Sequence, residues 1–372
     1  MTQLSSSPRI AEVRTKSTRL SSLDGWRAVS IIFVLGNHCQ YAWGFPPQLD
    51  PLFTWCFEGN LGVRFFFVIS GFLITWLMLV EYEKNGRVSL YHFYVRRALR
   101  ILPVYIAFLC VLLGLQMFTG FSQSTKEWIG NLTFTTDFIE ATWTSGHLWS
   151  LAVEEQFYLL WPIVFVLCGN LDPLRRSMLI LTIPIFLAPI ARVVSYLHLA
   201  PEILRPLFLR FSFFNCFDSL AIGCMSAIVF AHGQTGGYPR SRPILMAFVG
   251  AILILIPHVL LKTHQAGFFT ATLGNTFQAC GFCVLLVQSI HFPNFYFYRV
   301  LNRAWVQWVG VLSYSIYIWQ QIFSTSPKTY GIGPVWWMSF PGWLIPVFVV
   351  ATASYYGLER PFFKLRAYFR RP

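Results

Sequence analysis

Long apolar segments alternate with short polar ones from Trp26 nearly to the C-terminus of this 372-residue chain. Ten of them reach about 20 residues, the length that an α-helix needs to cross the hydrocarbon core of a bilayer. A helix satisfies its backbone hydrogen bonds internally, so we expect an all-α integral membrane protein with about ten transmembrane helices. The expected segments are residues 26–45, 59–80, 98–119, 147–168, 177–198, 211–232, 243–261, 268–290, 306–326 and 335–357.

The composition favours the same class of protein. Hydrophobic residues make up 55% of the chain and charged residues only 12%, against about 25% charged in soluble domains. No long polar stretch interrupts the segments, so we expect one transmembrane domain, residues 23–372. Residues 1–22 are polar, Ser-rich and basic, without the apolar core and cleavage site of a signal peptide. We interpret them as a flexible cytoplasmic tail.

Lys and Arg are distributed unevenly between alternate loops. One side, which includes both termini, carries 20 of the 28, the other side carries five, and Arg27, Arg64 and Arg192 lie inside segments. Since cytoplasmic loops hold the positive charge, we expect both termini in the cytoplasm of a multi-pass protein of the inner (plasma) membrane. The asymmetry also accounts for most of the net charge of +13, so the charge does not indicate a nucleic-acid partner.

The first segment carries two ionisable side chains, Arg27 at its start and His38 near its middle. Eleven residues on an α-helix turn through about 1100°, three turns plus about 20°, so both side chains lie on one face, about 16 Å apart. Ionisable groups are costly in lipid and usually face a bundle interior or a water-filled cavity, where they serve transport or catalysis. This face is the first candidate site.

A basic, aromatic stretch leads into the third segment on the expected cytoplasmic side. Arg97 and Arg100 have i, i+3 spacing, so on a helix they point the same way, and two guanidinium groups can hold a phosphate or diphosphate. Arg27 is expected at the same membrane level. Ordinary anchoring by snorkelling side chains is the alternative interpretation.

Two adjacent acidic residues, Glu154 and Glu155, lie about two turns into the fourth segment, at a depth that matches His38 within a turn. A carboxylate orients a neighbouring imidazole and makes it more basic. We therefore expect Glu154 or Glu155 to tune His38 as a general base. A buried polar cluster that holds helices together is the alternative.

Small residues recur in the second and sixth segments, in Ser70-Gly-Phe-Leu-Ile74 and Phe217-Asp-Ser-Leu-Ala-Ile-Gly223. They favour close contact between helices. Arg192 and Asp218 are charges inside lipid-length segments, so we expect each to have a partner, which is either the other or the substrate.

The eight cysteines indicate no disulfide framework, because most lie scattered through apolar segments. The Cys280-x-x-Cys283 pair falls inside the eighth segment, and we expect buried, inert thiols there. No cluster has convincing metal-ligand spacing, so we expect no metal.

Five strings of residues together resemble the membrane-bound acyltransferase family 3, which includes bacterial O-antigen and exopolysaccharide O-acetyltransferases. They follow the family order and cover essentially the whole chain after the tail. The strings are Leu23-Asp-Gly-Trp-Arg27 with ten residues before His38, Phe66-Phe-Val-Ile-Ser-Gly-Phe-Leu-Ile74, Tyr94-Val-Arg-Arg-Ala-Leu-Arg-Ile-Leu-Pro103, Trp149-Ser-Leu-Ala-Val-Glu-Glu-Gln-Phe-Tyr-Leu-Leu-Trp-Pro162 and Ser313-Tyr-Ser-Ile-Tyr-Ile-Trp319.

The resemblance implies transfer of an acyl group, usually acetyl from cytoplasmic acetyl-CoA, to a hydroxyl of a cell-surface glycan or lipid-linked saccharide. It makes His38 the catalytic histidine and Arg27 the start of an Arg-x10-His motif, and it matches Arg97 and Arg100 to an Arg-x-x-Arg motif for acyl-CoA binding. Many relatives carry His after the last string, where this chain has Gln320 and Gln321. We therefore assign that helix no acid–base role.

Two other functions are compatible with the same residues. One is acylation of a non-saccharide small molecule such as a macrolide. The other is a transporter or flippase, in which the buried charges would line a permeation path. The sequence has no convincing internal repeat, which favours the enzyme over the transporter. Direct attack by the acceptor and an acylated intermediate on the protein both fit the sequence.

Overall fold

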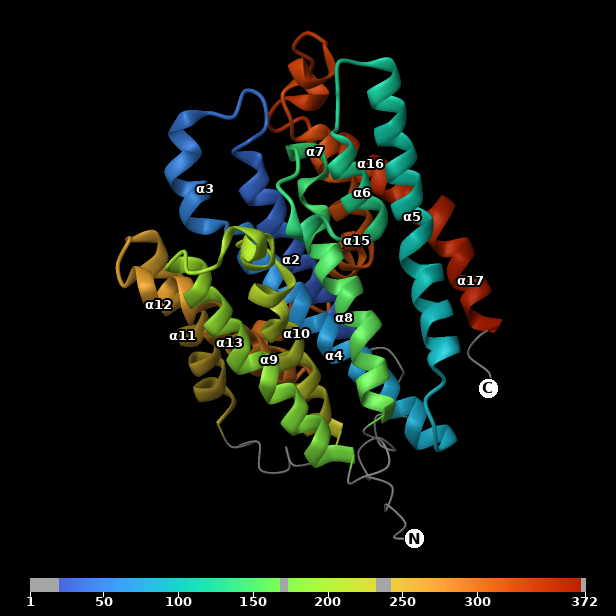
Figure 1. Ribbon diagram of the computed structural model, residues 1–372, viewed down its shortest axis with the longest axis vertical. Coiled ribbons are helices and arrows are strands. Elements are labelled where there is room, and N and C mark those ends of the chain that lie inside the picture. Colours follow the sequence, from blue (N-terminus) through green and yellow to red (C-terminus); the bar gives the residue numbers. More distant parts are fainter. Residues whose placement is uncertain (1–19, 168–172, 232–241, 369–372) are drawn as a thin grey trace. The chain divides into compact units, whose positions relative to one another are not determined.

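The computed structural model describes residues 20–167, 173–231 and 242–368, and in these ranges the chain is helical, without a β-strand (Figure 1). The all-α prediction is confirmed. Most of the predicted tail, residues 1–22, lies outside the described residues, as do the C-terminal Arg370 and Arg371. The described chain forms two compact units. Unit 1 contains the described residues up to Arg27, Arg64–Val88 and the described residues between Val153 and Gln307, and unit 2 contains Ala28–Val63, Ser89–Ala152 and the described residues from Trp308 onward.

Unit 1 is a set of packed helices in which α11 lies against α13, and α10 lies against α9 and α13 (Figure 1). Aromatic side chains fill its interior: the Phe65 and Phe282 rings stack with centroids 4.0 Å apart. The Trp161 indole donates to Thr75 Oγ1 at 2.9 Å, which satisfies a buried N–H. The helices of this unit are α9 (Pro173–Tyr196), α10 (Phe213–Ala231), α11 (Pro243–Lys262), α12 (Gly267–Thr272), α13 (Gly274–His291), α14 (Tyr296–Arg299) and most of α4 (Gly59–Asn85) and α8 (Leu148–Leu167).

Two glycines allow α4 and α10 to touch within unit 1. A Cβ atom at Gly71 would collide with the carbonyl oxygen of Leu220, and one at Gly223 would collide with the carbonyl oxygen of Val68. The contact is reciprocal, so each glycine makes room for the backbone of the other helix. The expectation that small residues in these segments serve close helix contact is confirmed.

In unit 2, α5 contacts α17. It also contacts α15, because the Tyr314 hydroxyl donates to the Ile101 carbonyl oxygen at 2.8 Å. Ser89 caps the start of α5 by accepting from the His92 N–H. The helices of this unit are most of α2 (Ser21–Cys39) and α15 (Ala304–Phe323), with α3 (Asp50–Cys56), α5 (Leu90–Phe118), α6 (Thr125–Thr133), α7 (Trp143–Gly146), α16 (Leu344–Ser354) and α17 (Arg360–Tyr368).

The loop between α5 and α8 is fixed by a capping box at α6. Ser124 and Glu127 cap each other's backbone N–H, and Glu127 Oε1 also accepts from the Thr142 N–H at 2.5 Å. Burial acts to raise the pKa of the Glu127 carboxyl, but the hydrogen bonds from Thr142 and Ser124 outweigh it and hold this pKa below its ordinary value. The ionised carboxylate thereby positions the chain just before α7.

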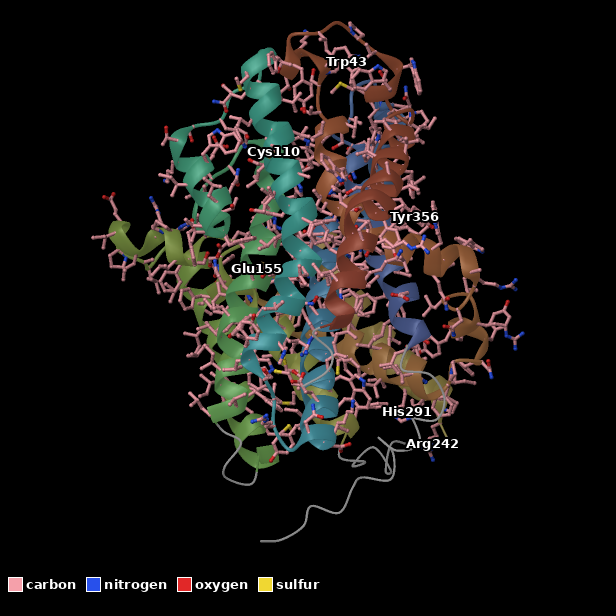
Figure 2. All side chains as sticks on the ribbon, turned by 90° about the vertical axis from the view of Figure 1, so that its right-hand side faces the viewer. Trp43, Cys110, Glu155, Arg242, His291 and Tyr356 are labelled. Carbon is pink, nitrogen blue, oxygen red and sulfur yellow. The ribbon has the colours of Figure 1, made fainter. Side chains whose placement is uncertain are left out.

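Every expected membrane segment contains helix, and in the described ranges five helical stretches are long and apolar enough to cross a membrane. They are Pro47–Asn85, Leu90–Phe118, Trp143–Leu167, Glu202–Ala231 and Pro243–Lys262. These are the helices of a multi-pass membrane protein. Apolar side chains such as Ile106, Leu113 and Phe118 are exposed along α5, which also carries the exposed Cys110 (Figure 2).

Two expected segments are not single helices. The segment 268–290 is divided at Leu273 into α12 and α13. The segment 335–357 starts with the short 3-10 turn Trp336–Met338 and becomes α-helical only at Leu344. The prediction of a continuous helix from residue 335 was therefore wrong. Pro341 and Gly342 explain the late start, because proline lacks a backbone donor and glycine disfavours helix.

All seven cysteines that the structure describes are free thiols. Cys280 and Cys283 lie on α13 and are half-buried rather than fully enclosed. Both are free thiols, so the two do not form a disulfide bridge.

Candidate active site

His38 lies next to the last residue of α2, and its ring is held by α15 within unit 2. His38 Nδ1 is 2.8 Å from Gln320 Oε1. An amide oxygen only accepts, so Nδ1 carries the proton and the lone pair of the neutral ring is on Nε2. His38 is half-buried, and Nε2 makes no hydrogen bond with any residue that the structure describes. The ring therefore presents a basic nitrogen that is free for a substrate proton.

Gln320 is the site residue that the sequence did not reveal. Its side chain is fully buried, and its other amide atom, Nε2, has no hydrogen-bond acceptor in the described part of the chain. A glutamine does not titrate, so Gln320 itself supplies no acid–base group. What α15 supplies instead is orientation of His38. The available signal was the pair of adjacent amides, Gln320 and Gln321, inside a helix of membrane-spanning length.

His147 differs from His38 because both of its ring nitrogens are occupied. Its Nδ1 lies 2.6 Å from Gln321 Oε1 and its Nε2 lies 3.0 Å from the Ile318 carbonyl oxygen. Tyr317 donates to the His147 carbonyl oxygen at 3.0 Å, and its hydroxyl is 2.6 Å from Ser150 Oγ. The ring thus joins the start of α8 to α15 and leaves no nitrogen for a substrate.

Two aromatic side chains lie beside His38. The Trp143 ring of α7 is centred 5.0 Å from the His38 ring, in an edge-on arrangement. The Tyr41 ring is centred 4.5 Å from that of Trp143 and is 58% exposed. The Trp143 Nε1 atom is buried and has no acceptor among the described residues.

The three candidate arginines are half-buried on two helices. Arg27 is in the part of α2 that belongs to unit 1, and its buried Nε has no hydrogen-bond acceptor in the described residues. Arg97 and Arg100 are in unit 2, one turn apart near the start of α5. Each is therefore placed on a helix as the sequence predicted, and joint binding of one anion stays a prediction.

Glu154 and Glu155 are half-buried in the part of α8 that belongs to unit 1. Glu154 Oε1 accepts a hydrogen bond from Ser70 Oγ of α4 at 2.7 Å. Figure 2 labels Glu155 on the same helix. The partner at His38 Nδ1 is an amide, not a carboxylate. The role of the two glutamates in tuning His38 stays a prediction.

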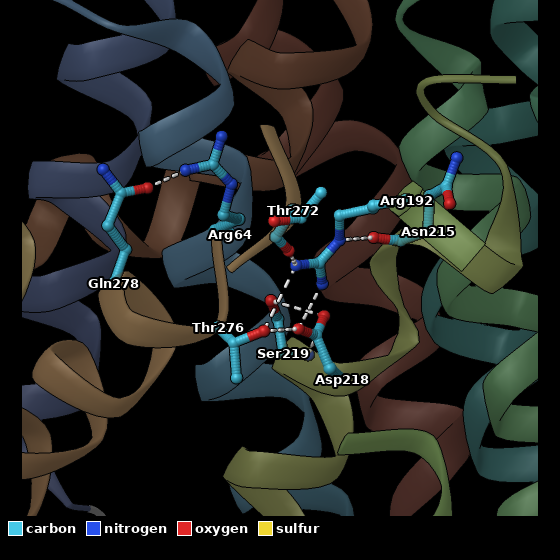
Figure 3. A network of polar contacts seen from close by, with 8 residues as sticks. All are labelled: Arg64, Arg192, Asn215, Asp218, Ser219, Thr272, Thr276 and Gln278. Carbon is cyan, nitrogen blue, oxygen red and sulfur yellow. Dashed lines mark hydrogen bonds and ion pairs between the residues drawn. The ribbon is translucent and has the colours of Figure 1, made fainter. Parts of the chain in front are cut away.

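The charges of Arg192 and Asp218 satisfy each other inside unit 1 (Figure 3). Arg192 also donates to the carbonyl oxygens of Asn215 and Thr272, at 2.9 and 2.6 Å. Asp218 accepts in addition from Thr276 Oγ1 at 2.6 Å. Both side chains are buried, with exposed fractions of 4% and 0%. Each charge therefore has the other as its partner, which is one of the two alternatives expected from the sequence, and the pair joins α9 and α10.

No group of three or more His, Cys, Asp or Glu side chains converges on a metal-sized site within the described ranges.

Comparison with known proteins identifies an acyltransferase domain over residues 20–359. The chain is 27% identical over 362 residues to the peptidoglycan O-acetyltransferase OatA of Listeria monocytogenes, with 91% of this chain and 55% of that protein covered. It is 25% identical to the putative peptidoglycan O-acetyltransferase YrhL of Bacillus subtilis, with 92% of this chain and 54% of that protein covered. It is 24% identical to the O-acetyltransferase OatA of Staphylococcus aureus, with 92% of this chain and 57% of that protein covered.

The chain spans about half the length of these relatives. No solved structure matches it.

Proposed function

Because this chain belongs to the acyltransferase family whose domain covers residues 20–359, we propose that it transfers an acetyl group from acetyl-CoA to a hydroxyl of a cell-surface or lipid-linked saccharide. The names of the relatives, peptidoglycan O-acetyltransferases, support a saccharide acceptor. The observation that carries the proposal is His38, whose Nδ1 is fixed by Gln320 while Nε2 stays open.

In the proposed reaction, His38 Nε2 takes the proton from the acceptor hydroxyl as its oxygen attacks the thioester carbonyl carbon. The new C–O bond forms, the C–S bond breaks, and the coenzyme A thiolate leaves. The imidazolium then returns its proton to that thiolate. The same proton path serves direct attack and attack by a protein side chain that is acylated first. Gln320 cannot take up a proton, so it keeps Nδ1 protonated throughout.

The donor is proposed to bind through Arg27, Arg97 and Arg100. Coenzyme A carries a diphosphate and a 3′-phosphate, and guanidinium groups bind phosphate through paired, charge-assisted hydrogen bonds. The buried Arg27 Nε, which lacks an acceptor in the described residues, supports an anion at this position. Arg97 and Arg100, one turn apart on α5, are spaced to share a phosphate.

The membrane arrangement is part of the same proposal. Ten crossings of the plasma membrane would place both termini in the cytoplasm, where acetyl-CoA is available to the basic side of the protein. Glu154 or Glu155 is proposed to raise the basicity of His38 through its charge. Arg192 and Asp218 are paired with each other and buried, so they do not need a transported ion or solute as a partner. This pairing favours the enzyme over the transporter.

The first test is binding and transfer with labelled acetyl-CoA and a crude envelope-glycan fraction. The wild type should bind the donor and label the glycan. Arg97→Ala should weaken donor binding about tenfold, in line with the loss of one charge-assisted contact. Gly114→Ala, at an open position of the same helix, is the control and should bind normally. A wild-type protein that binds no acyl-CoA at all would contradict the proposed acyl transfer and favour the transporter hypothesis.

A further inference from the structure

We propose that Tyr41 and Trp143 form the acceptor subsite, on which a sugar ring lies with its hydroxyl directed at His38. This inference rests on the proposed function and specifies where the saccharide binds. All three residues belong to unit 2. None of the sequence motifs contains Tyr41 or Trp143.

The first observation is an open aromatic surface beside the base. The rings of Tyr41 and Trp143 are centred 4.5 Å apart at an angle of 38°, and Trp143 is centred 5.0 Å from His38. Tyr41 is 58% exposed, so one side of this pair is accessible. Sugar rings present apolar C–H faces that pack on aromatic rings, while their hydroxyls at the ring edge reach polar groups. A sugar on this pair has an edge hydroxyl next to the imidazole.

The second observation is a pair of hydrogen-bond donors around His38 that lack acceptors. Trp143 Nε1 and Gln320 Nε2 are both buried, and neither has an acceptor in the part of the chain that the structure describes. Gln320 is fully buried, and its Oε1 is already used by His38. Buried donors are nearly always paired, so these two indicate a ligand with acceptor oxygens. The hydroxyl and ring oxygens of a saccharide supply them.

Tyr and Trp also gather at membrane interfaces, where their polar ends reach water or headgroups. That explanation suits Tyr41 but not Trp143, because an interfacial tryptophan keeps its N–H hydrated, whereas Trp143 Nε1 is buried without an acceptor among the described residues. The thioester group of acetyl-CoA has only one carbonyl oxygen to accept from these two N–H groups. The combination of an exposed ring, a buried indole N–H and a buried amide N–H therefore favours the saccharide.

The test uses the purified 372-residue chain in proteoliposomes, with labelled acetyl-CoA as the donor and soluble peptidoglycan fragments as the acceptor. The variants are Tyr41→Ala, Trp143→Ala and Trp143→Phe. The two alanine variants should raise the KM for the acceptor about tenfold, since aromatic stacking contributes on that scale. Trp143→Phe keeps the ring and loses the N–H, so a rise of about threefold is expected. The KM for acetyl-CoA should stay within about twofold.

Two variants serve as controls. Tyr41→Phe retains the ring and should have nearly the wild-type acceptor KM, which shows that the position tolerates substitution. Trp336→Ala removes an exposed tryptophan of the same unit that is not part of the proposed subsite, and it should change neither KM.

The outcomes separate the two proposals. A wild type that transfers acetyl, with alanine variants of unchanged acceptor KM, overturns the subsite and leaves the proposed function standing. Variants that raise the KM for acetyl-CoA instead assign the aromatic pair to the donor and also overturn the subsite. A wild type that consumes acetyl-CoA but labels no saccharide refutes the saccharide acceptor itself, and the subsite with it.

Discussion

Two histidines of unit 2 differ in what their ring nitrogens touch. His147 has an oxygen at each nitrogen, Gln321 Oε1 and the Ile318 carbonyl, whereas His38 has one at Nδ1 only. A general base needs an open lone pair, so the hydrogen bonds select His38 without reference to burial or to depth in the membrane. The two rings share α15 as a partner, so in the proposed reaction this one helix orients the base His38 and also holds His147 in place.

Gln320 should be required for orientation and not for proton transfer. Gln320→Leu removes the acceptor at His38 Nδ1 and should lower kcat about 10- to 100-fold, the usual effect of losing an orienting partner, with little change in the KM for acetyl-CoA. Gln320→Glu keeps an acceptor oxygen at that position and should recover much of the loss. Steady-state kinetics of the two variants give the comparison. Equal activity of the Leu variant and the wild type would rule out the orienting role.

At the scale of elements, the reciprocal glycine contact sets how closely α4 and α10 pack. Gly71→Ala and Gly223→Ala each drive a Cβ into a carbonyl oxygen of the other helix and should destabilise the protein by about 1–3 kcal/mol, the usual cost of overpacking. Gly114→Ala is a matched control, because a Cβ there meets nothing within 4 Å and alanine favours helix. Thermal unfolding in detergent measures all three. An unchanged midpoint for Gly71→Ala would mean that the two helices can separate freely.

The helices themselves were predictable from the sequence, because apolar length alone identifies a segment that satisfies its own backbone in lipid. The start of α11 at Pro243 was placed correctly, since proline suits the first turn of a helix. The late start of α16 was not predicted, because Trp336 and Trp337 are as apolar as helical residues, although Pro341 and Gly342 disfavour helix at this point. Apolar content sets which segments are buried but does not distinguish a helix from a turn.

At the scale of the whole molecule, the sequence could place candidate residues one by one, but it could not identify the hydrogen-bond partner of His38. Arg27 and His38 follow from charge inside one helix. The bond between His38 and Gln320 joins residues 282 positions apart, and no local pattern reports a contact of that range. The sequence therefore indicated a carboxylate partner from depth alone, while the structure has an amide at Nδ1. The pairing of Arg192 with Asp218 was accessible, because two opposite charges in lipid-length segments nearly require each other.

The most direct test of the account is chemical rescue of His38→Ala, measured as labelled acetyl transferred from acetyl-CoA to saccharide with and without added imidazole. Removing a general base should lower the transfer rate about 10²- to 10⁴-fold while donor binding persists. Free imidazole should restore part of that rate in His38→Ala and leave the wild type unchanged. A His38→Ala protein that transfers acetyl at the wild-type rate would contradict the account.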